Sequence, residues 1–504
     1  MTWQPTKLEE KRLEKLERLQ TAGVETYPLR VERTHTTTQA KEALIEAENS
    51  GGEAEIEVTV TGRLVSFRDM GKTVFAHIED GYGRIQLFVR RDNVGEESHR
   101  IFRKLLDLGD FVQAEGELFR TRTGEISVRV QDWKLLSKAV SPLPVVKEEK
   151  VDGQIIRHAA FSNVEERYRQ RYADLAVNPE VRETFRTRAR VISAVRRFMD
   201  DHDFLEVETP VLQPLYGGAA ARPFTTYHNQ LKQELYLRIS FELYLKRLLV
   251  GNIERVYEIG RDFRNEGVDH THNPEFTMLE FYAAYWDYND VMEFTERMID
   301  FVANEVLGTT QISYQGHDIN LAAPWPRMTM RDAIKQFAGI DYMDYPDAAS
   351  LAAAIRQIGG HAPADFSWGK LIDGLFGDYV EPKLIQPTII TQYPRDISPL
   401  AKGIPGDPLH VERFEYFIAG MEMGNAFTEL NDPIDQQARF EMLQELYAKG
   451  EDERNPIDED YLRAMRYGMP PNGGFGAGID RMVMLFADKA NIREVLLFPH
   501  LRER

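Results

Sequence analysis

The chain of 504 residues is 42% hydrophobic and 28% charged, which is typical of a water-soluble globular protein with room for about three domains of roughly 150 residues. Its 62 basic and 81 acidic residues give a net charge of −19, which argues against a general nucleic-acid binder, so any RNA contact must rest on local basic patches. The absence of cysteine excludes disulfides and thiol catalysis. No apolar run approaches the roughly 18 residues of a membrane span, and Met1 to Lys15 is too charged for a signal peptide, so we expect a cytoplasmic protein without a membrane partner.

Residues 1–54 are expected to form an N-terminal helical extension. Residues 6–22 place leucines on a partial helical stripe that ends at Gly23, and residues 36–52 are polar and predict a helix around 40–47. The basic residues of the first helix could contact an RNA backbone. Because they are interleaved with glutamates, i,i+4 pairs on a solvated helix account for them better.

Residues 55–141 show the period-two alternation of β-strands. Strand-like runs begin at Glu55 and recur at 73–79, 84–90, 111–119 and 125–136, with an apolar helix at 98–108 between the third and fourth runs. Five strands with a helix before the fourth is the order of an OB-fold β-barrel, whose strand face and loops bind oligonucleotides.

Residues 142–165 contain two prolines and a charged run, and are predicted to be an interdomain linker before a domain at 166–504. In that domain, residues 181–201 predict a long helix before the run FLEVETP at 204–210. Residues 237–249 predict a strand end that leads into a helix, with Glu242 near its start. Residues 308–403 read as a less regular insert, with helices at 330–337 and 348–358 and a strand at 387–392.

The segment RDFRNEGVDHTHNPEFTMLEFY, residues 261–282, predicts a hairpin that carries charges of both signs. On a solvated hairpin these charges would form cross-strand pairs worth only about 0.2–1 kcal/mol each. His270 and His272 could alternatively form a metal pair. With no cysteine and no third histidine at ligand spacing, we do not expect zinc here.

Two further segments concentrate polar groups near the C-terminus. RFEYFIAGMEMGNAFTELNDP, residues 413–433, predicts adjacent antiparallel strands that carry Glu415, Glu422, Asn425 and Glu429. GGFGAGIDRMVMLF, residues 473–486, places glycines before an apolar helix, as a dinucleotide-binding fingerprint does. No βαβ unit with an acidic residue about 20 positions on follows it, so this interpretation is weak.

Taken together, these segments resemble the class II aminoacyl-tRNA synthetases, and within them the lysine-specific group. The hairpin wording FRNEG, HNPEFTM and Glu-aromatic-Tyr resembles motif 2, the helix at 181–201 with its following strand resembles motif 1, and residues 473–486 resemble motif 3. The runs MGKTVFAHIEDGYGRIQLFV and TGEISV resemble the anticodon-binding domain of this group. The resemblance implies an α+β protein, with an N-terminal OB-fold β-barrel and a class II catalytic domain in which helices flank an antiparallel sheet.

The resemblance also implies partners and site residues. It implies a homodimer that joins lysine to tRNA(Lys) with ATP and Mg²⁺, and in which Arg264 and Arg481 carry catalysis by neutralising negative charge. Mg²⁺ takes one or two carboxylates plus phosphate oxygens, which Glu415 and Glu422 can supply. The residues expected to bind ATP are Arg264, Glu266, His272, Asn273, Phe276, Glu415, Glu422, Gly478 and Arg481. The residues expected to bind lysine are Gly218, Glu242, Arg264, Glu280, Tyr282, Asn425, Phe427 and Glu429.

The barrel is implied to read an anticodon rich in uridine. Phe75 and Phe88 are expected to stack on bases, and Gln86 and Glu125 to address the uracil edge. The alternative for both phenylalanines is a place in the barrel core. For Glu429 the alternative is an ion pair with an arginine of the protein.

Three alternative functions remain at this point. An aspartate or asparagine enzyme of the same subclass would need a cationic pocket in place of Glu429 and Tyr282. A relative that modifies a protein lysine through lysyl-adenylate would lack the barrel. A catalytically silent RNA-binding scaffold would have lost Arg264 or Arg481, which are both present.

Overall fold

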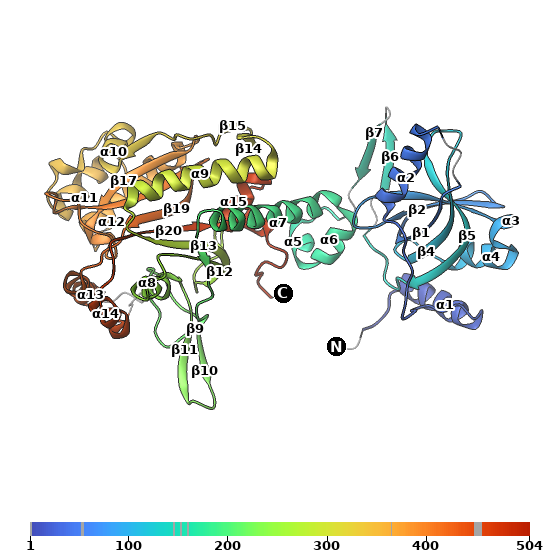
Figure 1. Cartoon of the computed structure of the whole chain (residues 1–504), viewed down its shortest axis with the longest axis horizontal. Coiled ribbons are helices and arrows are strands. Elements are labelled where there is room, and N and C mark those ends of the chain that lie inside the picture. The colour runs from blue at the N-terminus through green and yellow to red at the C-terminus, as the bar shows by residue number, and fades with distance from the viewer. Residues whose placement is uncertain are drawn as a thin grey trace. The chain divides into compact units, whose positions relative to one another are not determined.

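The computed structural model describes residues 3–51, 55–144, 147–151, 154–158, 161–363, 365–447 and 456–503 (Figure 1). The chain divides into two compact units, Met1–Arg167 with Tyr172–Val177 and Tyr168–Arg171 with Asn178–Arg504. None of the helices within the described ranges is both long enough and apolar enough to cross a bilayer.

Two helices open the first unit, α1 (Lys7–Thr21) and α2 (Thr37–Asn49), as predicted. Each begins with a capping box, in which the side chain of Thr6 or Thr36 accepts from the N–H three residues on and the side chain at that position accepts in return. Leu19 of α1 and Leu44 of α2 join the hydrophobic core of the barrel that follows. Both helices therefore belong to the packing of the first unit.

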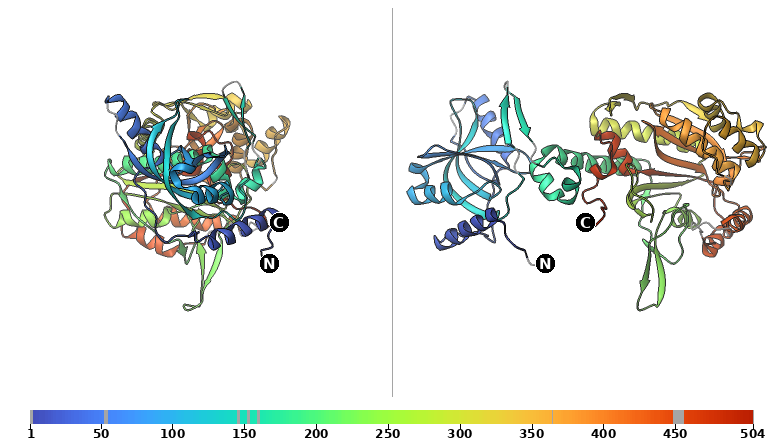
Figure 2. Two further views of the ribbon diagram at one scale, coloured as in Figure 1. Left: turned by 90° about the vertical axis from the view of Figure 1, so that its right-hand side faces the viewer. Right: turned by 180° about the vertical axis from the view of Figure 1, so that it is seen from behind.

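The first unit is built on a closed barrel of order β1-β2-β3-β5-β4, which confirms the predicted OB-fold (Figure 2). Its elements are β1 (Glu57–Asp69), β2 (Thr73–Glu79), β3 (Arg84–Arg90), α3 (Arg91–Val94), α4 (Glu96–Leu105), β4 (Phe111–Arg120) and β5 (Ile126–Ser137). Strand alternation sends Val74, Ala76 and Ile78 into the core at 0% exposure. Phe75 and His77, between them on β2, therefore lie on the opposite face.

The predicted linker at 142–165 falls partly outside the described residues, which omit 145–146, 152–153 and 159–160. Its described part forms a two-stranded antiparallel pair, β6 (Lys147–Val151) and β7 (Gln154–His158), and the start of α5 (Val164–Arg169). The sequence predicted a linker here and did not predict these two strands. Helix α6 (Arg171–Val177) follows.

The second unit is organised around one eight-stranded sheet of order β16-β17-β18-β19-β20-β13-β12-β8. All neighbours are antiparallel except the two edge pairs β12–β8 and β16–β17. The strands are β8 (Leu205–Glu206), β12 (Arg255–Phe263), β13 (Glu275–Ala284), β16 (Arg327–Thr329), β17 (Thr388–Pro394), β18 (His410–Ile418), β19 (Met421–Thr428) and β20 (Asn472–Gly478). The predicted hairpin is β12–β13, and it lies beside β20 near the middle of the sheet.

Helices cover one face of this sheet. Helices α7 (Pro179–Asp200), α9 (Tyr288–Leu307) and α15 (Ile479–Phe486) pack on one another and on the central strands over the largest hydrophobic core of the described residues (Figure 1). On the other side, α8 (Glu242–Val250) packs on β12 and β13, and α14 (Glu459–Arg466) packs on α8. Strand β9 (Leu212–Gln213) and the hairpin β10 (Thr225–His228) with β11 (Gln233–Leu237) form a separate small sheet. Helices α13 (Pro433–Tyr447) and α16 (Ile492–Val495) complete this part.

The region predicted as a less regular insert has its own core. Residues 308–403 hold β14 (Gln311–Tyr314), β15 (His317–Asn320), β16, α10 (Met330–Ala338), η1 (Tyr342–Asp344), α11 (Ala348–Gln357), α12 (Trp368–Tyr379), η2 (Glu381–Lys383), β17 and η3 (Arg395–Ile397). The two predicted helices and the predicted strand are present. Helix α12, which sequence patterning missed, buries Leu371, Ile372 and Leu375 against α10 and α11.

Candidate active site

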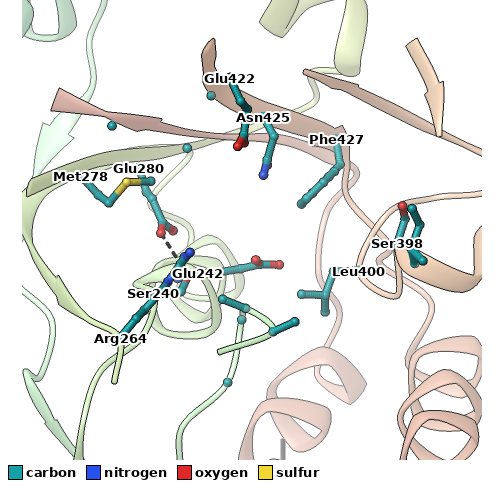
Figure 3. Close-up of a pocket in the computed structure, with 18 of the residues that line it drawn as sticks. Ser240, Glu242, Arg264, Met278, Glu280, Ser398, Leu400, Glu422, Asn425 and Phe427 are labelled. Atoms are coloured by element: carbon teal, nitrogen blue, oxygen red, sulfur yellow. Dashed lines mark hydrogen bonds between the residues drawn. The ribbon is translucent and has the colours of Figure 1, made fainter. Parts of the chain in front are cut away.

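A cavity of about 600 Å³ opens over the face of the sheet that the long helices leave free. It is lined from β13, β19, β20, the hairpin loop of motif 2, the start of α8 and the loop before α13. All the predicted ATP and lysine residues line it except Glu415. Figure 3 shows Glu242, Glu280, Asn425 and Phe427 pointing into one common space. The structure therefore brings together residues that are up to about 260 positions apart in the chain, as folding of distant strands into one sheet requires.

One half of the cavity carries cations and an aromatic ring. The guanidinium of Arg264 lies 5.1 Å from the ring centre of Phe276, and its Nε donates to the carbonyl of Ile239. Arg481, in the first turn of α15, donates from Nη1 to the carbonyl of Glu422 at 2.5 Å. Its Nη2 lies 3.1 Å from Nε2 of His272. Two arginines thus flank this half, which suits an anionic ligand with a planar ring.

His272 has partners on both ring nitrogens. Its Nδ1 lies 2.8 Å from Asp269, and its Nε2 faces the Arg481 guanidinium, which can only donate. The predicted donation from His272 to a phosphate therefore requires a change of partner when a nucleotide binds. His270 is held elsewhere, by Asn491, and within the described residues no group of three or more acidic or histidine side chains could hold a metal ion.

Three other predicted nucleotide residues lie on the same half. Glu266 lines the cavity from the exposed loop of the hairpin. Asn273 is buried, and its amide donates to the Glu275 carbonyl at 2.6 Å. Gly478 ends β20 and is the N-cap residue of α15.

The other half of the cavity is acidic and buried. Glu280 of β13 is 5% exposed and accepts hydrogen bonds from Ser240 Oγ at 3.0 Å and from the Tyr282 hydroxyl at 3.3 Å (Figure 3). Glu242 is 5% exposed and is the first residue of α8. The N-cap residue of this helix, Phe241, offers no side-chain acceptor, and the backbone N–H of Glu242 donates to Ser240 Oγ instead. Carboxylates are rarely buried unless a cation joins them.

The cation is Lys246, one turn along α8. Its Nζ donates to Glu242 Oε1 at 2.9 Å and contacts Glu429 Oε2. Lys246 and Glu429 are both 0% exposed in their side chains. The alternative of an arginine partner for Glu429 is thus not what the structure shows, because the partner is a lysine. Sequence reasoning missed Lys246, whose i,i+4 spacing from Glu242 predicts only a surface pair.

Burial sets the protonation of this half. Desolvation raises the pKa of Glu429 to about 8, opposed by the charge of Lys246. Burial also raises the pKa of Glu280 well above its ordinary value, and the charges of Asp262 and Glu242 add to this. Burial lowers the pKa of Lys246, but the carboxylates of Glu242 and Glu429 outweigh it and leave that pKa well above its ordinary value. Lys246 is therefore a cation, and the pocket around it favours a ligand that brings further positive charge.

Two glycines make room for the acidic half. Gly218 has φ +88°, and a Cβ there would stand 2.9 Å from Ser240 Oγ. A Cβ on Gly474 of β20 would overlap Glu429 Oε1 and the ring of Tyr282. The glycine-rich strand of motif 3 therefore leaves space for the buried carboxylate.

Between the two halves stand residues of β18 and β19. Asn425 pairs with Glu415 on one side and with Gly476 on the other, so it lies at the centre of the sheet, with Phe427 two residues along β19. Glu422 lines the cavity beside Arg481, at 3.3 Å from Nη1. Glu415 does not line the cavity, but Arg413, which does, donates to it at 2.5 Å, and the Tyr393 hydroxyl donates to its other oxygen at 2.9 Å.

The charges around Glu415 bear on the expected Mg²⁺. Burial raises the pKa of Glu415 to about 7, and the negative charges of Glu422 and Asp373 add to the rise while Arg413 opposes it. A divalent cation brought by ATP phosphates would relieve this repulsion, and it needs only one or two protein carboxylates. Glu422, which lines the cavity, therefore fits the ion directly, and Glu415 fits it once Arg413 or Tyr393 releases one of its oxygens.

The predicted anticodon residues form two adjacent rows on the outer face of the barrel. Phe75 of β2 pairs with Phe88 of β3, with ring centres 5.2 Å apart, so neither lies in the core. In the next row Gln86 donates to Glu125 Oε2 at 2.8 Å. His77, which sequence reasoning missed, holds the other oxygen of Glu125 at 2.7 Å.

Comparison with known proteins agrees with this geometry. Residues 163–502 match the family model described as tRNA synthetases class II (D, K and N), and residues 58–136 match the model of the OB-fold nucleic acid binding domain. The chain is 53% identical over 498 residues to the lysine-tRNA ligase of Roseiflexus sp. strain RS-1, covering 99% of both chains. It is 52% identical to the lysine-tRNA ligases of Chloroflexus aurantiacus and Pelotomaculum thermopropionicum, over 99% and 98% of this chain and 98% and 94% of theirs. The chain therefore belongs to the lysine-tRNA ligase family of the class II tRNA synthetases.

Proposed function

We propose that this chain joins L-lysine to tRNA(Lys) through a lysyl-adenylate, releasing pyrophosphate and then AMP. The observation that carries the proposal is the division of one cavity into two halves. Arginines and Phe276 line one half, and the buried carboxylates Glu242, Glu280 and Glu429 line the other. The first half suits ATP, which a class II enzyme of this family uses, and the second suits an amino acid with two ammonium groups.

The first step needs no nucleophile from the protein. One oxygen of the lysine carboxylate attacks the α-phosphorus of ATP, an O–P bond forms, and the bond to the β-phosphate oxygen breaks to release pyrophosphate. Both reactants are anionic, so Arg264 lies where its guanidinium can bridge the carboxylate and the α-phosphate, while Phe276 stacks on adenine. Arg481 covers the other face of adenine and meets the γ-phosphate, and Glu266, Asn273, His272 and Gly478 complete the nucleotide site.

We propose that Glu415 and Glu422 would hold Mg²⁺ that arrives with ATP. The ion supplies positive charge to the phosphate oxygens. Glu415 would have to exchange Arg413 or Tyr393 for the ion, because these two side chains hold both of its oxygens in the free protein.

The amino acid lies in the acidic half in this proposal. Glu242 and Glu280 lie near Ser240 and Gly218, where they can take the α-ammonium, and Glu429 takes the ε-ammonium. Asn425 and Phe427 line the wall above the aliphatic chain (Figure 3). The Tyr282 hydroxyl donates to Glu280 in the free protein, so it serves Glu429 only after a change of partner.

In the second step a hydroxyl of the terminal tRNA ribose attacks the adenylate carbonyl, and AMP leaves. We propose that anticodon reading belongs to residues 55–141 and the chemistry to residues 166–504. Phe75 and Phe88 would stack on bases at about 1–3 kcal/mol each, while Gln86 and Glu125 address uracil edges.

The family model also covers aspartate and asparagine enzymes, and the cavity argues against both. Aspartate would bring a second carboxylate next to three buried carboxylates, which repel it, and asparagine would leave Glu429 without a cation. The test is amino-acid-dependent ATP–pyrophosphate exchange with all twenty amino acids. Exchange with lysine alone is expected, and exchange with aspartate or with none would refute the proposal.

We further propose a homodimer formed through the motif 1 region. Leu205, Val211 and Leu212 follow α7 and are 40–51% exposed, which is unusual for neighbouring large apolar side chains on one segment. Sedimentation equilibrium of the chain and of Leu212→Asp tests this. The proposal predicts twice the chain mass for the first and a lower mass for the variant.

A further inference from the structure

Lys246 is a buried cation that the reaction as proposed does not use. Its side chain is 0% exposed, and its Nζ lies between Glu242, 2.9 Å away, and Glu429. The rings of Tyr282 and Tyr461 have their centres 6.0 and 5.9 Å from the same nitrogen. The two carboxylates come from different parts of the fold, since Glu242 starts α8 and Glu429 follows the end of β19.

One nitrogen in contact with both carboxylates fixes how far apart they stand. Two hydrogen-bond lengths separate the bound oxygens by at most about 6 Å. The second oxygen of each carboxylate is not used by Lys246, and both residues line the cavity. The bridge therefore sets the spacing of the two groups that, in the proposed function, receive the two ends of the substrate.

The charges of this half also depend on Lys246. This half holds three buried carboxyl groups, and the ammonium of Lys246 pairs with two of them, Glu242 and Glu429, while Ser240 and Tyr282 donate to Glu280. Lysine brings two more ammonium groups, which favour loss of the protons that burial places on these carboxyl groups, so that three cations then face three anions. The carboxylate of the lysine is left for Arg264. Without Lys246 the pKa values of Glu242 and Glu429 would rise further, because Lys246 is the charge that opposes their burial, and a protonated carboxyl group binds an ammonium group less tightly.

We propose that Lys246 is a positioning and specificity-determining residue, which rests on the proposed function: it clamps Glu242 and Glu429 at the spacing that fits lysine and not a diamino acid one methylene shorter. A purely structural ion pair would anchor α8 and affect stability alone. The two roles differ in one measurable quantity, the ratio of kcat/KM for lysine to kcat/KM for ornithine.

The test is pyrophosphate exchange by Lys246→Met, which keeps the length of the side chain and removes its charge. One methylene is worth about 10- to 200-fold in discrimination, so loss of the clamp should reduce the lysine-to-ornithine ratio at least tenfold. The KM for lysine should rise, and the KM for ATP should stay near the value of the unmodified protein.

Lys138→Met is the matched control. Lys138 is also buried and bridges two carboxylates, Asp107 at 2.6 Å and Asp110 at 2.8 Å, but it lies in the other unit. The Lys138→Met substitution should lower the melting temperature and leave the lysine-to-ornithine ratio of kcat/KM unchanged. If Lys246→Met folds and shows the same pattern as this control, the inference is wrong.

Lys246→Ala with propylamine covers the case in which the Met variant does not fold. Propylammonium replaces the three carbons and the ammonium group that the substitution removes, and 1-propanol is its neutral control. Recovery of the lysine-to-ornithine ratio with the amine and not with the alcohol supports the clamp. Recovery of the melting temperature without recovery of the ratio overturns it. If the protein without substitutions shows no pyrophosphate exchange with lysine, the proposed function itself is wrong. That result does not depend on any Lys246 variant, so the two failures can be told apart.

Discussion

Replacing Glu429 by glutamine is the most direct test of how the cavity selects its amino acid. The change keeps the shape of the side chain and removes its charge. Glu429 is 0% exposed, so no water can compensate for the loss at the ε-ammonium of a bound lysine. We expect kcat/KM for lysine to fall while the KM for ATP is unchanged, because ATP lies against Phe276 and Arg481.

The magnitude follows from the burial. A buried ammonium that loses its charged partner costs about 3–5 kcal/mol, and the remaining amide oxygen returns about 1 kcal/mol as a neutral hydrogen bond. A net loss of about 3 kcal/mol is a factor of about 150 in kcat/KM. Norleucine has the four side-chain carbons of lysine and no ammonium, so its kcat/KM should change by less than about threefold, which is about 0.6 kcal/mol. The lead of lysine over norleucine should narrow by about two orders of magnitude.

The assay is steady-state pyrophosphate exchange with both amino acids, measured beside the melting temperature. Lys246 also loses a partner in Glu429→Gln, so the melting temperature is expected to fall. Glu296→Gln is the control, because Glu296 of α9 is 4% exposed, does not line the cavity, and accepts from the backbone N–H of Trp325 at 3.0 Å. A variant of Glu429 that melts lower but keeps the lysine-to-norleucine ratio would refute the assignment of this residue to the substrate.

Three further outcomes are expected. Arg264→Ala should slow single-turnover adenylate formation at least tenfold, since a charge-assisted contact is worth about 1.5–3 kcal/mol, whereas Arg261→Ala, on the exposed part of the same hairpin, should not. Phe75→Ala should weaken tRNA charging and leave pyrophosphate exchange intact, and the control Phe111→Ala on β4 should change neither activity. Equal loss of both activities by Phe75→Ala with a folded barrel would contradict the assignment of anticodon binding and catalysis to separate domains. The pKa of Glu429 is about 8, and a bound ammonium favours its carboxylate, so lysine should bind more tightly as pH rises towards 8 and its binding should release a proton. Calorimetry at neutral pH in buffers of different ionisation enthalpy measures this proton release. Equal heats of binding in all buffers would exclude the proton release.

Much of the fold could be predicted from hydrophobic periodicity and from the order of residues in the motifs. Period-two alternation at 73–79 and 84–90 separates core residues from the outer face, and the barrel uses that register for Phe75 and Phe88. The hairpin of motif 2 was predicted because its turn signals and its residue order are local. Helix α12 was missed, because its apolar stripe is interrupted by three glycines, which patterning treats as loop signals.

The site was predictable as a set of residues but not as a set of partners. Glu415 was expected to be a ligand of Mg²⁺, but its partners in the free protein were not predicted: they are Arg413, two residues before it on the same strand, and Tyr393 of the neighbouring strand. Strand register decides these contacts, because the pairing of β17 with β18 brings Tyr393 to Glu415, 22 positions further along the chain. His77 was overlooked for the same reason, since its partner Glu125 is 48 positions away.

The acidic half of the cavity shows most clearly what sequence patterns cannot predict. Glu242 and Lys246 are four residues apart on a helix, and on a solvated surface that pair would contribute only about 0.3–0.5 kcal/mol. Burial makes the interaction of this pair much stronger than it would be on the surface, because β13 and α14 cover α8. In addition, Glu429, which follows the end of β19, contacts the same ammonium group. Glu429 in turn fits only because Gly474 of β20 carries no side chain. The energies that select the substrate therefore arise where segments near 242, 280, 429 and 474 meet, and no single segment carries enough information to predict them.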